Sequence, residues 1–176
     1  FSVDLLGEAC LSDSEAQMYR DKYLDLIANL PGEVATWAPN ARLESDHLGA
    51  IPRTNVSIKI SSLFARTDPI DFAGSLNGLV DALTPILVAA QKNGVFVNFD
   101  MEQFSLKDLT LELFMRCCEK VPFSAGIAMQ SYLRSGENDA QRIIDWSKKT
   151  GRVVTVRLVK GAYWDSQTIQ SEQFGW

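Results

Sequence analysis

Residues 95–101 have the sequence VFVNFDM, and this segment indicates the fold class. It is short and rich in β-branched and aromatic residues, which is typical of a strand. Side chains alternate along a strand, so Val97 and Phe99 share one face while Asn98 and Asp100 share the other. The segment is therefore predicted to be a strand whose two faces meet different surroundings.

Four further segments have the same strand character, at residues 1–7, 55–63, 125–133 and 152–159. Longer segments with helical spacing separate them, which implies parallel strands joined by crossover helices. No glycine fingerprint of a dinucleotide-binding sheet follows the first strand. The fold class is therefore predicted as α/β, and a (β/α)8 barrel is favoured. Residues 1–176 are expected to supply about the first five βα units, as the N-terminal part of one barrel domain.

The segments between the predicted strands carry helix signals. Ser12 opens a capping box, and Pro31 is expected to end the helix that follows. The third helix is expected to begin at Ser105 and the fourth at Asp139. Residues 31–53 form a long connection that is expected to cover one end of the sheet.

Composition argues against several classes of protein. The chain has 176 residues, of which 46% are hydrophobic and 22% charged, and a net charge of -5. Lysine and arginine form no basic run, so no nucleic-acid contact is expected from this segment. No stretch is expected to be apolar over the roughly 18 residues that span a bilayer, and no secretory signal is expected. Because no Met opens the chain, we expect it to begin inside a longer gene product.

Cysteine usage argues against a disulfide scaffold and against a zinc site. Cys10, Cys117 and Cys118 are odd in number and lack metal-ligand spacing. A reducing, cytoplasmic setting is the simplest interpretation. The adjacent pair is predicted to pack in the core as small apolar residues.

Polar side chains recur on one face of every predicted strand after the first. Lys59 and Ser61 share a face of the second strand, and Asp100, Gln130 and Arg157 follow on the third, fourth and fifth. Burying such groups unpaired costs several kcal/mol, but these charges are complementary. They lie toward the C-terminal ends of the strands, where barrel enzymes place their chemistry. The pattern favours a site; a structural ion network or an open sheet with one wet face remains the alternative.

The residue types narrow the chemistry. No histidine lies in a predicted strand, so neither a Ser-His pair nor a transition-metal site is expected. Together the four inward side chains could hold an anionic substrate and a polar planar cofactor, and Arg157 and Gln130 suit the edge of such a cofactor. The Gly161-Ala162 pair lets the backbone approach a ligand closely. Two other interpretations stay open: a Schiff-base aldolase with Lys59 as nucleophile, and a noncatalytic assembly segment of a larger enzyme.

Four segments carry a specific resemblance to a known family. They are FSVDLLGEA at 1–9, NVSIKISSL at 55–63, NFDMEQFSLKDLTLELF at 98–114 and VRLVKGAYWDSQT at 156–168. In this order they resemble the proline dehydrogenase domain of bacterial proline utilization A proteins. The long connection at 31–53 has no motif that matches.

That resemblance implies a distorted (β/α)8 barrel that binds FAD at the C-terminal ends of its strands. It implies oxidation of L-proline to Δ1-pyrroline-5-carboxylate by hydride transfer to the flavin, the first step of proline catabolism. The expected partners are L-proline, a membrane quinone that receives the electrons, the remaining barrel strands, and a pyrroline-5-carboxylate (glutamate semialdehyde) dehydrogenase domain in the same polypeptide. The expected location is the cytoplasm, with peripheral contact at the inner face of the membrane.

The resemblance also assigns roles to individual residues. Asp100 and Arg157 are expected to be catalytic, with Arg157 donating near flavin N5. The residues expected to contact the substrate are Lys59, Ala162 and Tyr163. The residues expected to bind the flavin are Met101, Gln130, Arg157, Val159, Lys160, Gly161, Ala162 and Trp164. Glu8 resembles a gate carboxylate, and no metal is implied.

Overall fold

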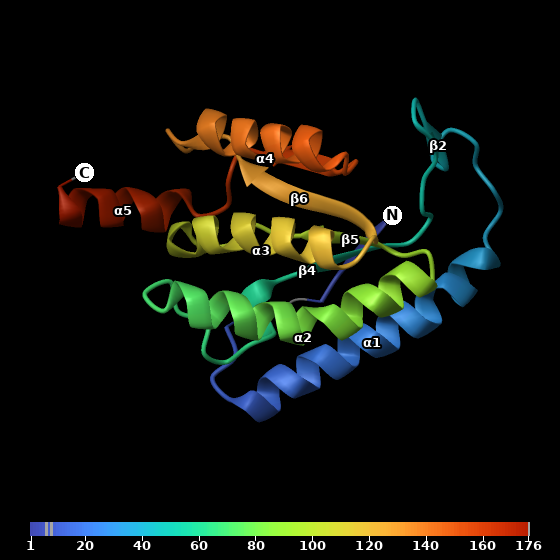
Figure 1. Cartoon of the computed structure of the whole chain (residues 1–176), viewed down its shortest axis with the longest axis horizontal. Coiled ribbons are helices and arrows are strands. Elements are labelled where there is room, and N and C mark those ends of the chain that lie inside the picture. The colour runs from blue at the N-terminus through green and yellow to red at the C-terminus, as the bar shows by residue number, and fades with distance from the viewer. Residues whose placement is uncertain (6, 8, 176) are drawn as a thin grey trace.

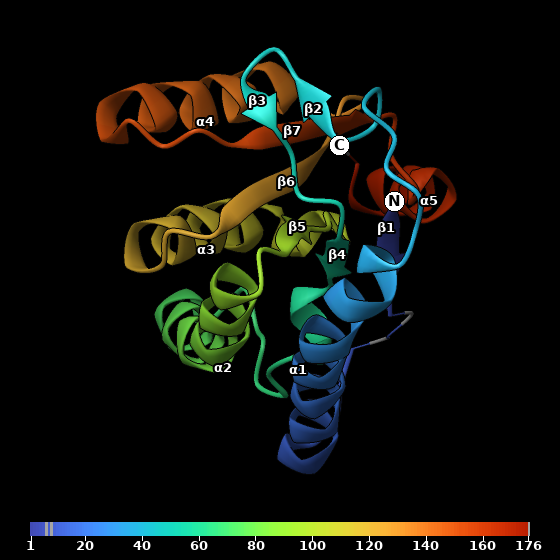
Figure 2. The same ribbon diagram turned by 90° about the vertical axis from the view of Figure 1, so that its right-hand side faces the viewer.

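The computed structural model describes residues 1–5, 7 and 9–175 of the chain. Its main feature is a parallel five-stranded sheet with the order β1-β4-β5-β6-β7. The strands are β1 (Ser2–Asp4), β4 (Asn55–Ile58), β5 (Phe96–Phe99), β6 (Ser124–Gln130) and β7 (Thr155–Val159). Each strand of this sheet lies beside the next sheet strand along the chain, without the reversal of order that marks a doubly wound sheet. Figure 1 shows β4, β5 and β6 in this succession, and Figure 2 labels all five strands.

Helices follow the strands in alternation. They are α1 (Asp13–Ala35), α2 (Phe72–Lys92), α3 (Lys107–Lys120), α4 (Gly136–Thr150) and α5 (Trp164–Phe174). Figure 2 shows α1 to α4 along the outer side of the curved sheet, with α5 apart from them. The sheet is an open segment of a barrel. Strand β7 forms one edge, where Leu158 is 70% exposed.

The register of the strands decides which side chains face the barrel interior. One row across the sheet consists of Asp4, Ser57, Asn98, Gly126 and Thr155, paired strand by strand. The next row, which faces the helices, contains Ile58, Phe99 and Ile127. Small and polar residues therefore face inward while large apolar residues face the helical layer, as the alternation along 95–101 predicts.

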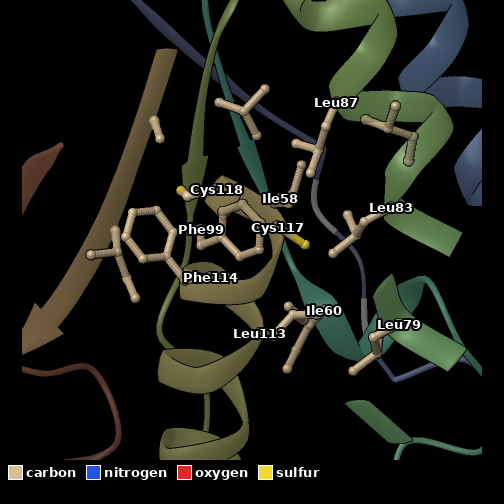
Figure 3. Packing of buried hydrophobic residues seen from close by; sticks show 14 of the residues in the cluster. Ile58, Ile60, Leu79, Leu83, Leu87, Phe99, Leu113, Phe114, Cys117 and Cys118 are labelled. Atoms are coloured by element: carbon tan, nitrogen blue, oxygen red, sulfur yellow. The ribbon is translucent and has the colours of Figure 1, made fainter. Parts of the chain in front are cut away.

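The core lies between the outer face of the sheet and the helices (Figure 3). Its central side chains, all fully buried, are Ile58, Phe99, Leu83, Leu87 and Phe114. The rings of Phe99 and Phe114 meet edge to face with centroids 5.4 Å apart. Burying each such side chain stabilises the fold by about 1.5–3 kcal/mol, so this layer holds the strands in register.

The three cysteines are free and buried. The prediction that Cys117 and Cys118 pack in the core is therefore confirmed. Burial raises the pKa of Cys117, and it raises that of Cys118 to about 12. Both thiols are thus protonated near neutral pH, which fits a packing role.

Helix α2 corrects the expectation about apolar stretches. Of the described helices it alone is long and apolar enough to cross a membrane by length and composition, with a mean hydropathy of 1.4. The expectation that no stretch is this apolar was wrong. The physical reason is that α2 packs against α1, α3 and β5 together, so apolar residues occupy more than one of its sides.

Helix α1 continues past Pro31, where the sequence predicted its end, and reaches Ala35. A proline inside a helix removes one hydrogen bond and costs about 3 kcal/mol. Tyr23, Ile27 and Val34 of the same helix are buried. Their packing outweighs the local preference of Pro31 and keeps the last turn helical.

The starts of the third and fourth helices also differ from expectation. Ser105 lies in a 3₁₀ turn, η2 (Phe104–Leu106), and α3 begins at Lys107 without a side-chain cap. Asp139 lies inside the first turn of α4, not at its start. Its carboxylate accepts hydrogen bonds from Lys107 Nζ and Ser135 Oγ, both at 2.8 Å. Asp139 thus joins the two helix starts, which local capping rules do not predict.

The second strand is shorter than predicted. It ends at Ile58, and a 3₁₀ turn, η1 (Ile60–Ser62), replaces its expected second half. Ser61 therefore leaves the strand alternation that was expected to place it beside Lys59. Five βα units imply a helix after the fifth strand, but the sequence did not place it. Helix α5 has low amphipathicity and no buried residues, which explains why no periodic signal marks it.

The long connection at 31–53 contains a hairpin, β2 (Ser45–Asp46) with β3 (Gly49–Ala50). Arg53 fixes its base, because Nε lies 3.0 Å from Glu44 Oε1 and Nη2 donates to the carbonyl of Trp37. The hairpin and the first residues of β4 to β7 line a cavity of about 800 Å³. The connection was expected to cover one end of the sheet, and the end that it covers is the one where the strands begin.

Replacing Leu83 by alanine in a protein that contains the complete barrel should lower the free energy of unfolding by about 2–5 kcal/mol, because a cavity opens in the core. Urea denaturation followed by tryptophan fluorescence measures the loss. Leu11→Ala is the control, since Leu11 is 90% exposed, and it should change stability by less than about 0.5 kcal/mol. Equal losses of stability in the two variants would show that Leu83 of α2 contributes no more to the core than an exposed leucine does.

Candidate active site

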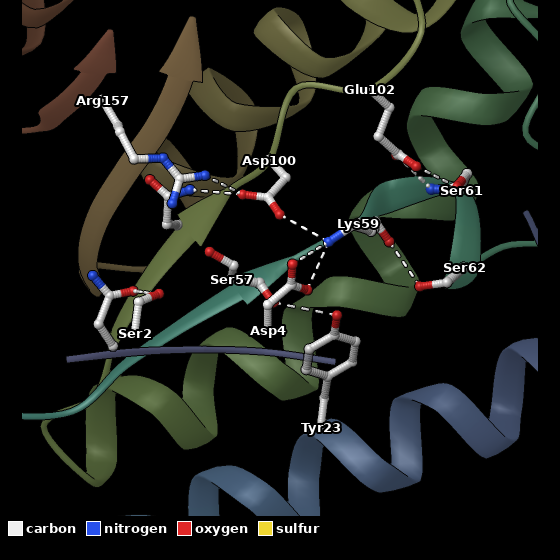
Figure 4. Close-up of polar contacts among 12 residues, drawn as sticks. Ser2, Asp4, Tyr23, Ser57, Lys59, Ser61, Ser62, Asp100, Glu102 and Arg157 are labelled. Carbon is white, nitrogen blue, oxygen red and sulfur yellow. Dashed lines mark hydrogen bonds and ion pairs between the residues drawn. The ribbon is translucent and has the colours of Figure 1, made fainter. Parts of the chain in front are cut away.

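Four charged side chains form a continuous run of ion pairs where the strands end (Figure 4). Lys59 Nζ lies 2.6 Å from Asp4 Oδ2 and 3.0 Å from Asp100 Oδ2. Arg157 Nη2 lies 2.6 Å from Asp100 Oδ1, and Asn98 Nδ2 donates to the same oxygen at 3.1 Å. We call Asp4, Lys59, Asp100 and Arg157 the charge ladder.

The strand register places the charge ladder. Lys59 follows the last residue of β4, and Asp100 follows the last residue of β5. The amide of Asp100 donates to the carbonyl of Ile58 at 3.0 Å, which extends the pairing just beyond both strands. Arg157 pairs in register with Ala128 of β6, so it lies on the same inner face. The side chains are close because parallel strands end at one edge of the sheet.

The charge state of Lys59 decides between two chemistries. Burial opposes its charged form, but hydrogen bonds from Nζ to Asp4 and Asp100 outweigh that effect and raise its pKa. A Schiff-base lysine requires the opposite shift, toward a free amine near neutral pH. The geometry therefore disfavours the aldolase interpretation and leaves Lys59 as a fixed positive charge.

A cavity of about 370 Å³ opens beside the charge ladder. Its lining residues are Lys59, Asp100, Met101, Glu102, Ala128, Arg157, Val159, Lys160, Gly161, Ala162 and Tyr163. Most of the predicted site residues are therefore brought together around one space. Gln130 and Trp164 do not line it, and Glu8 lies outside the described residues.

Sequence reasoning missed three of the residues at this site. Asp4 ends β1 and is an ion-pair partner of Lys59, and Glu102 and Ala128 line the cavity. The rule that found Asp100 could have found two of them. Asp4 is also polar and ends its strand, and Glu102 continues the alternation of Asn98 and Asp100.

Comparison with protein families decides the relationship. The family model described as proline dehydrogenase matches residues 1–176. The chain belongs to the proline dehydrogenase family. The bifunctional protein PutA of Escherichia coli K12 is 27% identical over 179 residues, which cover 99% of this chain and 13% of that protein. The proline dehydrogenase of Deinococcus radiodurans is 30% identical over 171 residues, which cover 96% of this chain and 46% of that one.

Solved structures agree with this assignment. The crystal structure of proline utilization A from Bdellovibrio bacteriovorus, inactivated by N-propargylglycine, matches with a TM-score of 0.94 and 42% identity. The match covers all of this chain but 19% of that one, so the chain spans a small part of its relatives. The α/β class and the interpretation as a segment of a (β/α)8 barrel are confirmed.

Membership of the proline dehydrogenase family implies a flavin cofactor, and Gln130 fits one. At the end of β6, its Nε2 donates to the backbone carbonyl of Glu102 at 3.2 Å. Its Oε1 is buried, and none of the described residues donates a hydrogen bond to it. A buried acceptor of this kind is costly unless a ligand N–H reaches it, and a flavin ring supplies such a donor.

The segment after β7 also suits a flat ligand. Gly161 has φ +134°, a conformation that side chains rarely adopt, and a Cβ there would collide with the ring of Tyr132. A glycine is therefore needed where the chain passes Tyr132, and Gly161 itself lines the cavity with its backbone. Trp164, at the start of α5, is 58% exposed and packs against Tyr132 with ring centroids 5.9 Å apart. It borders this wall without lining the cavity.

Tyr163 contributes a neutral hydroxyl to the cavity. Burial is the main cause that raises its pKa, and the negative charges of Glu102 and Asp100 add to the shift. The hydroxyl therefore stays protonated throughout the physiological range. It is a hydrogen-bond donor that carries no charge of its own.

The raised pKa of Lys59 can be tested by chemical labelling. The pH dependence of its acetylation by acetic anhydride, followed by peptide mass spectrometry, should report a pKa above the ordinary value of about 10.5. Asp4→Asn should lower that pKa, because one of the two stabilising carboxylates is lost. Exposed Lys149 serves as the reference. An unchanged pKa in Asp4→Asn would show that Asp4 does not hold the charge of Lys59.

Proposed function

We propose that the protein oxidises L-proline to Δ1-pyrroline-5-carboxylate with FAD, as the first step of proline catabolism. The observation that carries the proposal is the charge ladder beside a cavity, in a chain of the proline dehydrogenase family. The residues that line this cavity supply the positive charges of Lys59 and Arg157 and the uncharged hydroxyl of Tyr163. The relatives are larger than this chain, so activity, substrate and partners are proposed for the whole protein.

Bound FAD would supply an acceptor for the hydride of proline. The residues proposed to hold it are Met101, Gln130, Arg157, Val159, Lys160, Gly161, Ala162 and Trp164. Gln130 would offer its unpaired Oε1 to a ring N–H, and the backbone at Gly161, which lines the cavity, would lie against the ring. Both features suit a planar ligand with polar edges better than a flexible aliphatic one.

Arg157 is proposed to stabilise negative charge at the edge of the ring. Asp100 accepts a hydrogen bond from Nη2 and so orients the guanidinium. The side chain remains 47% exposed and lines the cavity, so its other N–H groups can face a ligand. Asp100 thus acts by orienting the guanidinium of Arg157. The guanidinium is already in position before negative charge develops on the ring.

The substrate is proposed to bind between Lys59, Ala162 and Tyr163. Proline is a small zwitterion, and its carboxylate needs a fixed positive charge, which Lys59 supplies. The hydroxyl of Tyr163 offers a neutral donor, while Ala162 leaves room beside it. Glu8 is proposed as a gate carboxylate on the resemblance alone.

The wider assignments are proposals as well. We propose that residues 1–176 form the N-terminal part of a barrel domain that further strands complete. Electrons pass to a membrane quinone, and a dehydrogenase domain in the same polypeptide oxidises the product. Several relatives are bifunctional PutA proteins, which supports the second domain. We propose a cytoplasmic location with peripheral contact at the inner membrane face.

The full-length protein tests the proposal. Purified with FAD, it should absorb visible light and bleach when L-proline is added without oxygen. N-propargylglycine, which inactivates the protein from Bdellovibrio bacteriovorus, should also inactivate this one. No bleaching by proline would reject the proposed reaction, and rescue of a complementary fragment without flavin binding would favour the assembly interpretation.

Replacing Arg157 by methionine in the full-length protein should slow flavin reduction by proline about 100-fold, because one preorganised donor at the developing charge is removed. Stopped-flow absorbance under anaerobic conditions measures the rate. Arg116→Met is the control, since Arg116 lies on α3 and pairs with Glu112 on the same helix. Reduction as fast in Arg157→Met as in the control would remove Arg157 from the mechanism.

A further inference from the structure

Glu102 lies beside the charge ladder but takes no part in it. It is 8% exposed, and none of the ion pairs of the described residues includes its carboxylate. The carboxylate instead accepts two hydrogen bonds from one residue, from Ser61 N at 3.1 Å and from Ser61 Oγ (Figure 4). A buried carboxylate held by neutral donors is costly, so its position needs a reason.

The backbone of Glu102 faces the opposite way. Its carbonyl accepts the hydrogen bond from Gln130 Nε2. Ser61 lies in the 3₁₀ turn directly after Lys59, whereas Gln130 ends β6. Glu102 therefore connects the turn after β4 to the end of β6, across the strand that lies between them.

This connection decides which end of the Gln130 amide is free. A carbonyl can only accept, so it selects Nε2 and leaves Oε1 without a partner. Among the described residues, the carbonyl of Glu102 is the group that accepts a hydrogen bond from this amide, so the amide would lose its fixed orientation if that carbonyl moved away. The side chain of Glu102 prevents this movement because it anchors the loop to Ser61.

We propose that Glu102 is a positioning residue that acts through Gln130. Its carboxylate anchors the loop on Ser61, and its carbonyl turns Gln130 so that an acceptor faces the flavin. The inference rests on the proposed function, since it concerns the same flavin site. It assigns to Glu102 a geometric role, which an uncharged side chain of the same shape and hydrogen-bonding capacity can fill.

A double-mutant cycle in the full-length protein tests this role, with the dissociation constant of FAD as the readout. Glu102→Met and Gln130→Ala should each weaken FAD binding about 10-fold, the size expected for one lost hydrogen bond. The double variant should also be about 10-fold weaker, because both changes remove the same contact. A loss near 100-fold in the double variant, the product of independent effects, would overturn the proposal.

Two further variants separate positioning from loss of folding. Glu102→Gln can accept from Ser61 N and donate to Ser61 Oγ, so it should stay within about 3-fold of the parent. Binding as weak as in Glu102→Met would reject the geometric role. Ser61→Ala removes one hydrogen-bond donor to Glu102 and should weaken FAD binding only when Gln130 is present. An equal loss of affinity in the Gln130→Ala variant would also reject the geometric role of Glu102.

The outcome is independent of the proposed reaction. If proline fails to bleach the flavin of the parent protein, the proposed function fails, while the FAD-binding cycle still reports on Glu102. If proline bleaches the parent and the cycle is additive, only the positioning role fails. Glu119→Gln is the control, because Glu119 accepts from Trp146 at 2.8 Å on the outer helices and should leave FAD binding unchanged.

Discussion

The carboxylate of Asp100 is the constraint on which the site depends. It accepts hydrogen bonds from Lys59, Asn98 and Arg157, which come from the ends or inner faces of three strands. Two cations beside one another would repel, and Asp100 lies between them. Removing one member of a partly buried ion network leaves the others uncompensated, so these side chains hold their positions together. Asp4 supplies a second negative charge, on the side of Lys59 that faces away from Asp100.

The charge ladder is possible because the opposite face of the sheet is well packed. Ile58 and Phe99 are fully buried against the helices, and each directly precedes a charged residue, Lys59 or Asp100. A shift of one residue in the pairing of either strand would bury a charge in the core and expose an apolar side chain. The apolar contacts that stabilise the barrel segment therefore also fix which charges meet at its inner edge.

The family relationship and the geometry support one another at particular residues. Alternation along the strands selects Lys59, Asp100, Gln130 and Arg157 without any knowledge of relatives. The structure joins the first, second and fourth in one ion network. Gln130 lies apart from that network, and its unpaired acceptor fits the flavin that the family implies. The raised pKa of Lys59 disfavours the aldolase interpretation, although the residue type allowed it.

The sequence by itself determined the order of the five sheet strands and the four helices between them, and the inward face of the strands, because these follow from local periodicity. Periodicity also selected three charged residues of the cavity, whereas the resemblance to the family supplied most of the others. Tertiary structure alone decided where elements end and which groups pair. Packing of Val34 allows α1 to continue past Pro31. A 3₁₀ turn replaces the strand that was predicted at Ser61, and Ser61 donates a hydrogen bond to Glu102 instead. Such choices depend on contacts between segments far apart in the chain, whose energies exceed the preferences that a short stretch of sequence encodes.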